Sequence, residues 1–156
     1  MIPPEFERLV PDAVAWVKEM EKEILENGQV LSPARKKDAK EIGIDGVEDV
    51  RVVVRPNIPK PHHPELAALA HKTNLITERT GGMTFGHGIV LMTAYENDRS
   101  IIAHELVHVK QYEQFGGIEP FLRAYLPEVL LPPGYPHGPM EQQAAREALR
   151  VCSLPN

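Results

Sequence analysis

The sequence contains a single cysteine, Cys152, among 156 residues. One cysteine excludes a disulfide within the chain, which fits a reducing compartment or a fold that needs no covalent cross-link. The chain also lacks any stretch that approaches 18 consecutive apolar residues, so we expect no transmembrane helix. Its first residues do not combine a basic segment with an apolar run, as a signal peptide would. We therefore expect a cytoplasmic protein that does not bind membranes.

Basic residues are fewer than acidic residues in this chain. The chain has 17 Lys and Arg residues against 22 Asp and Glu residues, for a net charge of −5 at pH 7. This balance argues against a dedicated nucleic-acid-binding protein. The only basic cluster, residues 35–37, is typical of a solvated helix face. Apolar residues make up 42% of the chain, which is ordinary for a globular protein and sufficient for one compact domain.

Hydrophobic spacing and turn residues divide the chain into short elements. Proline is abundant, with 15 residues, and implies many stiff connections. The predicted helices are 11–27, 33–42, 65–74, 98–115, 118–131 (with Pro127 as a kink or break) and 140–152. The predicted strands are 47–54, 83–85 and 89–93, and four prolines predict an extended loop at 56–64. This order of elements predicts a single α+β domain.

The most informative segment is 104–108, which matches the pattern H-E-x-x-H inside a predicted helix. Positions four residues apart share one helix face, so His104 and His108 can direct two imidazoles at the same metal ion. Glu105 is turned about 100° from His104, and its carboxylate reaches beside the metal, where it can take a proton from water. The surrounding apolar residues predict a buried helix, in which these three side chains need a partner. We therefore predict a metal site.

A catalytic zinc commonly has a third protein ligand. The metzincin pattern would require Gly at position 111 and His at position 114, but the chain has Gln111 and Gln114, which excludes that class. A Glu on a later helix is the alternative, and Glu141 is preferred because a helix and a return loop fit between it and His108. The other candidates are Glu113, Glu119, Glu128 and Glu147. Alternatively, Glu141 only stabilises the start of its helix through the helix dipole.

Several further residues extend the H-E-x-x-H pattern into a family resemblance. They are Val109 to Tyr112, Phe121, Arg123 to Leu126, Gly134-Tyr135, Pro139-Met140-Glu141 and Ala144. With these residues the chain resembles the small gluzincin-type peptidase domains sometimes called minigluzincins. The resemblance covers residues 83–150 at most, and the helical N-terminal region 1–80 keeps no assigned role.

The resemblance implies a zincin-like α+β fold, in which a small mixed sheet packs on the H-E-x-x-H helix with further helices at both ends. It also implies a Zn²⁺ ion held by His104, His108 and Glu141, with Glu105 as the catalytic base. In one respect the chain departs from the family. Larger gluzincins place an Asp four residues after the ligand Glu to orient the first His, whereas this chain has Ala145. We therefore expect the orienting partner to come from elsewhere.

The predicted function is zinc-dependent hydrolysis of peptide bonds in a peptide or protein substrate, with Glu105 as general base for the attacking water. The oxyanion needs a further donor besides the zinc. Tyr135 and His137 are the candidates nearest to Glu141 in sequence, and Tyr125 is a third. The strand 89–93 would offer backbone groups to an extended peptide if it formed the edge of the sheet.

Two other functions remain open. The first is a latent or non-catalytic metal-binding protein, in which the N-terminal region or the proline-rich loop fills the cleft and restrains substrate entry. The second is an interaction module in which the H-E-x-x-H match is accidental. The pair His62-His63 is expected to be solvated in its loop rather than to bind metal, because adjacent residues of an extended chain point in opposite directions.

Overall fold

A computed structural model describes residues 1–156 as a mixed α+β fold with six α-helices and one four-stranded sheet. The α-helices are α1 (Val10–Asn27), α2 (Pro33–Ile42), α3 (Pro64–Lys72), α4 (Arg99–Phe115), α5 (Ile118–Leu130) and α6 (Pro139–Cys152). The strands are β1 (Gln29–Val30), β2 (Arg51–Arg55), β3 (Gly82–Phe85) and β4 (Gly88–Met92). Short 3₁₀ helices are η1 (Pro4–Leu9), η2 (Val47–Asp49) and η3 (Thr93–Tyr95). None of the helices combines the length and the apolar content that crossing a bilayer requires.

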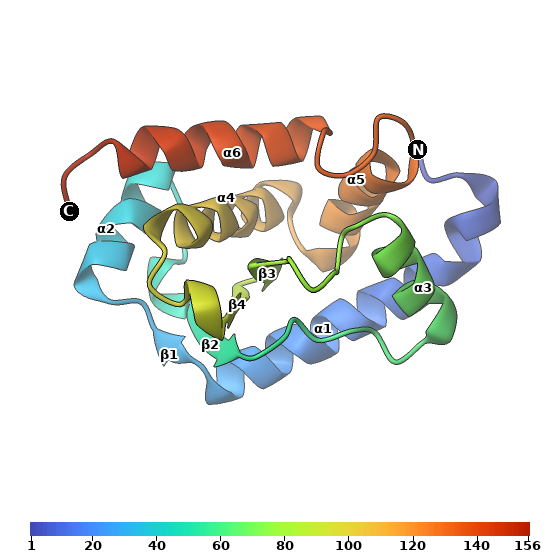
Figure 1. The fold of residues 1–156 in the computed structure, drawn as a ribbon, viewed down its shortest axis with the longest axis horizontal. Helices are drawn as coiled ribbons and strands as arrows, with labels where there is room; N and C mark the ends of the chain where they lie inside the picture. The colour runs from blue at the N-terminus through green and yellow to red at the C-terminus, as the bar shows by residue number, and fades with distance from the viewer.

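The elements are stacked in layers (Figure 1). The sheet lies between α1 on one side and α4 on the other, and α6 runs along the outer side of α4. Helices α3 and α5 lie toward one end of the molecule and α2 toward the other. The predicted α+β class is confirmed, and α4, the helix of the H-E-x-x-H pattern, lies in the middle of the stack.

The strand β4 is central in the sheet, whose order is β1-β2-β4-β3. It pairs in parallel with β2 and antiparallel with β3. Ile89, Val90 and Leu91 are all fully buried, and such a continuous apolar run is typical of a strand covered on both faces. The predicted strand 89–93 is therefore a central core strand, and the condition under which it would bind an extended peptide, a place at the sheet edge, is not met. The edge beside α4 is β3.

The predicted elements agree closely with the structure, with three additions and one shift. The 3₁₀ helices η1 and η3 and the two-residue strand β1 were not predicted, because none of them is long enough to show a hydrophobic period. The predicted strand 47–54 begins only at Arg51, since residues 47–49 form the 3₁₀ turn η2. Helix α5 continues through Pro127 to Leu130.

The ends of α4 are set by local sequence. The carboxylate of Asp98 accepts hydrogen bonds from the backbone N–H groups of Ser100 and Ile101, which caps the N-terminus. Gly116 ends the helix in the left-handed conformation, with φ of 87°, which suits a residue without a side chain. Asp98 and Gly116 therefore set the start and the end of α4, and both histidines lie between them.

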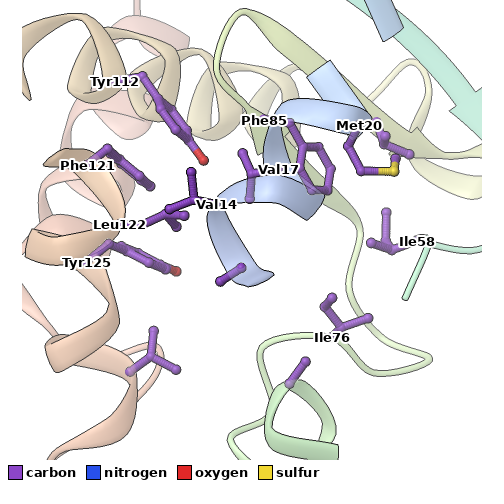
Figure 2. Packing of buried hydrophobic residues seen from close by; sticks show 14 of the residues in the cluster. Val14, Val17, Met20, Ile58, Ile76, Phe85, Tyr112, Phe121, Leu122 and Tyr125 are labelled. Carbon is purple, nitrogen blue, oxygen red and sulfur yellow. The ribbon is translucent and has the colours of Figure 1, made fainter. Parts of the chain in front are cut away.

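The N-terminal region is part of the same core as α4 and α5. Helix α1 buries Val10, Ala13, Val14, Val17, Met20 and Ile24. Figure 2 shows Val14 and Val17 directed toward Tyr112 of α4 and Phe121 of α5. The rings of Tyr112 and Phe121 stack with their centres 3.7 Å apart. Because α1 supplies one side of this cluster, the N-terminal helix is part of the scaffold that supports α4 and α5.

We predict that Ile24→Ala lowers the free energy of unfolding by about 3 kcal/mol, because it leaves a cavity in the core. Ile24 is 1% exposed, and its side chain packs directly against Gly88 of β4. Its neighbour Leu25 is 40% exposed, so Leu25→Ala is expected to cost less than about 1 kcal/mol. Urea denaturation of both variants measures the difference. Equal losses would contradict the placement of α1 in the core.

Candidate metal centre

Two helices bring three potential metal ligands together. Helix α4 presents His104 and His108 on one face, and the first turn of α6 presents Glu141. The Nε2 atom of His104 lies 2.9 Å from Oε1 of Glu141, and Nε2 of His108 lies 2.9 Å from Oε2. The three ligand atoms all lie within 4.8 Å of one another. This group can hold a metal ion.

The position of Glu141 follows from how α6 begins and packs. The backbone N–H of Met140 donates a hydrogen bond of 2.8 Å to Glu128 of α5, which fixes the first turn of α6. Gly138 lies so close to Glu128 that any side chain there would collide with it. One turn further on, Ala144 is completely buried, so its small side chain permits close packing of α6 on the core. The carboxylate is therefore placed by contacts with both α4 and α5.

The four other candidate glutamates have different partners. Glu113 binds His87 and the backbone N–H groups of Asp45 and Gly46. Glu128 binds the start of α6, as described above. The remaining two form ion pairs near the surface, Glu119 with Arg123 and Glu147 with Arg150. Glu141 alone among them joins the two imidazoles.

Burial and hydrogen bonding act in opposite directions on the charges of this site. Burial lowers the pKa of His108, but the hydrogen bond and the charge of Glu141 outweigh it and raise the pKa to about 9. Burial likewise raises the pKa of Glu141, and the bonds to His104 and His108 reverse this, so that its pKa lies well below the ordinary value. Glu141 is therefore a carboxylate, and its charge favours the protonated form of His108.

A second layer of side chains orients these ligands. The amide oxygen of Gln111 lies 2.8 Å from Nδ1 of His108, and the amide nitrogen donates to the carbonyl of Met140 and to Gln143. Because an amide oxygen only accepts, this arrangement places a proton on Nδ1, and Nε2, which faces Glu141, is the nitrogen that would bind a metal. The hydroxyl of Tyr125 donates a bond of 2.8 Å to Oε2 of Glu141. Each of these two ligands is therefore held by a neighbouring side chain.

The role of Gln111 was not anticipated from the sequence. A glutamine three residues after His108 lies on the same helix face, and this spacing could have indicated the contact. Ala145, which stands where larger gluzincins have an orienting Asp, is exposed. A side chain at this position therefore does not orient a histidine in this chain. The orienting partner in this chain acts on the second histidine and comes from α4 itself.

Glu105 lies beside the three ligands without joining them. Its side chain is 6% exposed and lines the same cavity as His104, His108 and Glu141. The hydroxyl of Thr84 on β3 donates a hydrogen bond of 2.8 Å to Oε1 of Glu105. At Gly82 a side chain would meet Glu105 at 3.0 Å, so the glycine lets β3 pass close to this carboxylate.

The structure separates the candidates for the oxyanion donor. Tyr135 is half-buried and lines the cavity, and burial together with the charges of Glu141 and Glu105 raises its pKa. Tyr125 also lines the cavity. His137 is exposed and does not line it, so the structure does not bring this residue to the site. Of the pair expected to be solvated, His62 is exposed, whereas His63 is half-buried and lies 3.8 Å from Asp12.

Comparison of the chain with family models, curated proteins and solved structures finds no match. The chemistry of the site therefore has to be argued from its own residues.

We predict that Gln111→Leu weakens metal binding by about 10- to 100-fold, because His108 loses the partner that orients its ring. Gln114→Leu is the matched control, since Gln114 lies on the same helix but is exposed. Isothermal titration of the metal-free protein with Zn²⁺ measures both affinities. An unchanged affinity of the Gln111 variant would contradict the orienting role.

Proposed function

We propose that this chain is a zinc-dependent peptidase with a zincin-like fold. The observation that supports the proposal most is the convergence of His104, His108 and Glu141, with the carboxylate of Glu105 in the same cavity. Two imidazole nitrogens and one carboxylate oxygen are the donor set of catalytic zinc sites that keep a fourth position open. The resemblance of residues 83–150 to minigluzincins agrees with this assignment.

Zinc, when bound, supplies a Lewis acid that polarises a carbonyl group and makes water more acidic. Glu105 is the group of the chain that accepts the proton of the attacking water and returns it to the departing amine. Its hydrogen bond from Thr84 fixes the orientation of the carboxylate and leaves the other carboxylate oxygen available for this proton. His104 and His108 accept no proton in this scheme, since their Nε2 atoms serve as ligands.

The edge strand β3 is suited to hold a peptide beside this site. The backbone N–H of Met92 in β4 donates a hydrogen bond to the carbonyl of Gly81, just before β3. In an antiparallel pair, bonded and non-bonded residues alternate along the strand, so the backbone groups of Gly82 and Thr84 point away from β4. The carbonyl of Thr84 already accepts a bond from the hydroxyl of Tyr112. Gly82 therefore offers its N–H and C=O to an extended substrate, directly next to Glu105.

Tyr135 is the better of the two tyrosines for stabilising the oxyanion. The hydroxyl of Tyr125 is already engaged with Glu141, where it orients the ligand. Tyr135 has no hydrogen-bond partner within the chain, and its raised pKa keeps the hydroxyl protonated as a donor. His137 is too exposed to share this role.

A metal-binding protein without catalytic activity is the second candidate. The observation that favours it is the enclosure of the cavity by the N-terminal region, to which η1, α1 and α3 all contribute. Both candidates require the metal, but only the peptidase requires Glu105. The comparison of metal content with activity therefore separates them.

The first test concerns the metal. We expect elemental analysis of the purified protein to find about one zinc per chain, and His104→Ala to lose it, because two ligands do not hold zinc tightly. His71→Ala is the control, since His71 is exposed on α3. Full zinc retention in the His104 variant would overturn the ligand assignment.

The second test concerns the proton acceptor. Glu105→Gln preserves the shape of the side chain and all three ligands, so zinc should remain bound while peptide hydrolysis falls by about 10³-fold or more. Glu119→Gln, at an exposed position of α5, should leave the rate unchanged. Measurement of hydrolysis over a peptide library compares the three proteins. If the Glu105 variant retains wild-type activity, Glu105 is not the base.

A further inference from the structure

The candidate metal centre forms one part of the wall of a cavity of about 140 Å³. Of the 31 residues that line this cavity, 22 are hydrophobic. The charged or imidazole side chains among them are those of His104, Glu105, His108 and Glu141, all of which belong to the site itself. Beyond the site, the wall carries no charged side chain, its polar side chains are uncharged hydroxyls, and most of it is apolar, so it favours an apolar group.

The N-terminal region supplies about half of this lining. Trp16 and Ala13 of α1, Leu66 and Ala70 of α3, and Ile76 after α3 all contribute to the wall. Trp16 is held in place by edge-to-face contact with Phe85 of β3, with ring centres 5.1 Å apart. Residues 1–80 thus shape the space next to the metal centre as well as supporting the core.

The size of the cavity decides what kind of apolar group fits. In another protein, an apolar cavity of about 150 Å³ binds one benzene molecule. A single aromatic ring or a branched aliphatic side chain is of this size, whereas a long fatty acyl chain exceeds it. The dimensions therefore select an amino-acid side chain rather than a lipid.

We propose that this cavity binds one large apolar side chain of the substrate, such as Phe or Leu, and that residues 1–80 thereby determine substrate preference. The inference rests on the proposed peptidase function. Transfer of such a side chain from water into an apolar site favours its binding over glycine by about 10- to 100-fold.

The test uses the zinc-loaded full chain and two metal-chelating probes, N-acetyl-phenylalanine hydroxamate and N-acetyl-glycine hydroxamate. We expect the phenylalanine probe to bind about 10- to 100-fold more tightly. Ala70→Phe fills the cavity and should abolish this preference while zinc and the glycine probe still bind. Ala68→Phe, two residues away on the exposed side of α3, should keep the preference. Equal affinities of the two probes for the wild type, or an undiminished preference in a folded Ala70 variant, would overturn the proposal.

The two proposals can fail separately. Since probe binding needs the metal but no proton transfer, it is measured in the Glu105→Gln protein as well. A probe preference without hydrolysis by the wild type would support the cavity assignment and reject the peptidase. Hydrolysis without a preference for apolar side chains would support the peptidase and reject the cavity assignment. A chain that binds no metal would overturn both proposals. If Ala70→Phe does not fold, as judged by circular dichroism, Ala13→Leu fills the same cavity from α1.

Discussion

The buried carboxylate of Glu141 is the interaction on which the arrangement of α4, α5 and α6 depends. An ionised group taken out of water costs several kcal/mol unless hydrogen bonds and opposite charge offset the loss, roughly as for any buried ion. Here the offsetting groups are His104 and His108 of α4 and Tyr125 of α5. No single helix can satisfy this carboxylate, so the three helices must adopt their places together. A metal ion meets the same constraint, because it supplies positive charge between the same atoms.

The hydrogen-bond network extends from His108 to Gln111, which connects α4 to the start of α6. Gln111 is 1% exposed, yet each polar atom of its amide has a partner, in His108, Met140 and Gln143. A buried amide that is fully bonded stabilises a unique arrangement, whereas a partly bonded one would destabilise the core. The residue that orients His108 is thus also a link between α4 and the start of α6. The orientation of His108 and the packing of α6 on α4 are therefore coupled through one side chain.

The structure gives the N-terminal region a role in the core. Sequence alone left residues 1–80 without a role and made a removable lid over the cleft a reasonable hypothesis. In the structure, Ile24 and Val17 pack against the sheet and α4, so α1 cannot be removed without exposing the core. The same region also lines the cavity beside the metal centre. This region therefore both supports the core and lines the cavity beside the candidate metal centre.

The sequence by itself determined the helices, the strands β2, β3 and β4 apart from the start of β2, and the two histidines that share one face of α4. These features depend on spacing within a single element: the 3.6-residue period, the cap at Asp98 and the stop at Gly116. Glu141 was preferred among five glutamates because a helix and a return loop fit between it and His108, and the resemblance agreed with this choice. Spacing of this kind permits the contact but does not place the carboxylate.

Only the tertiary structure decided which glutamate meets the imidazoles, that β3 rather than β4 forms the sheet edge, and that His137 faces solvent. The physical reason is that such contacts join residues far apart in the chain. Their formation depends on how α6 packs on α4 and how β2 pairs with β4 in the sheet. The spacing of apolar residues within one helix or strand contains no information on either arrangement.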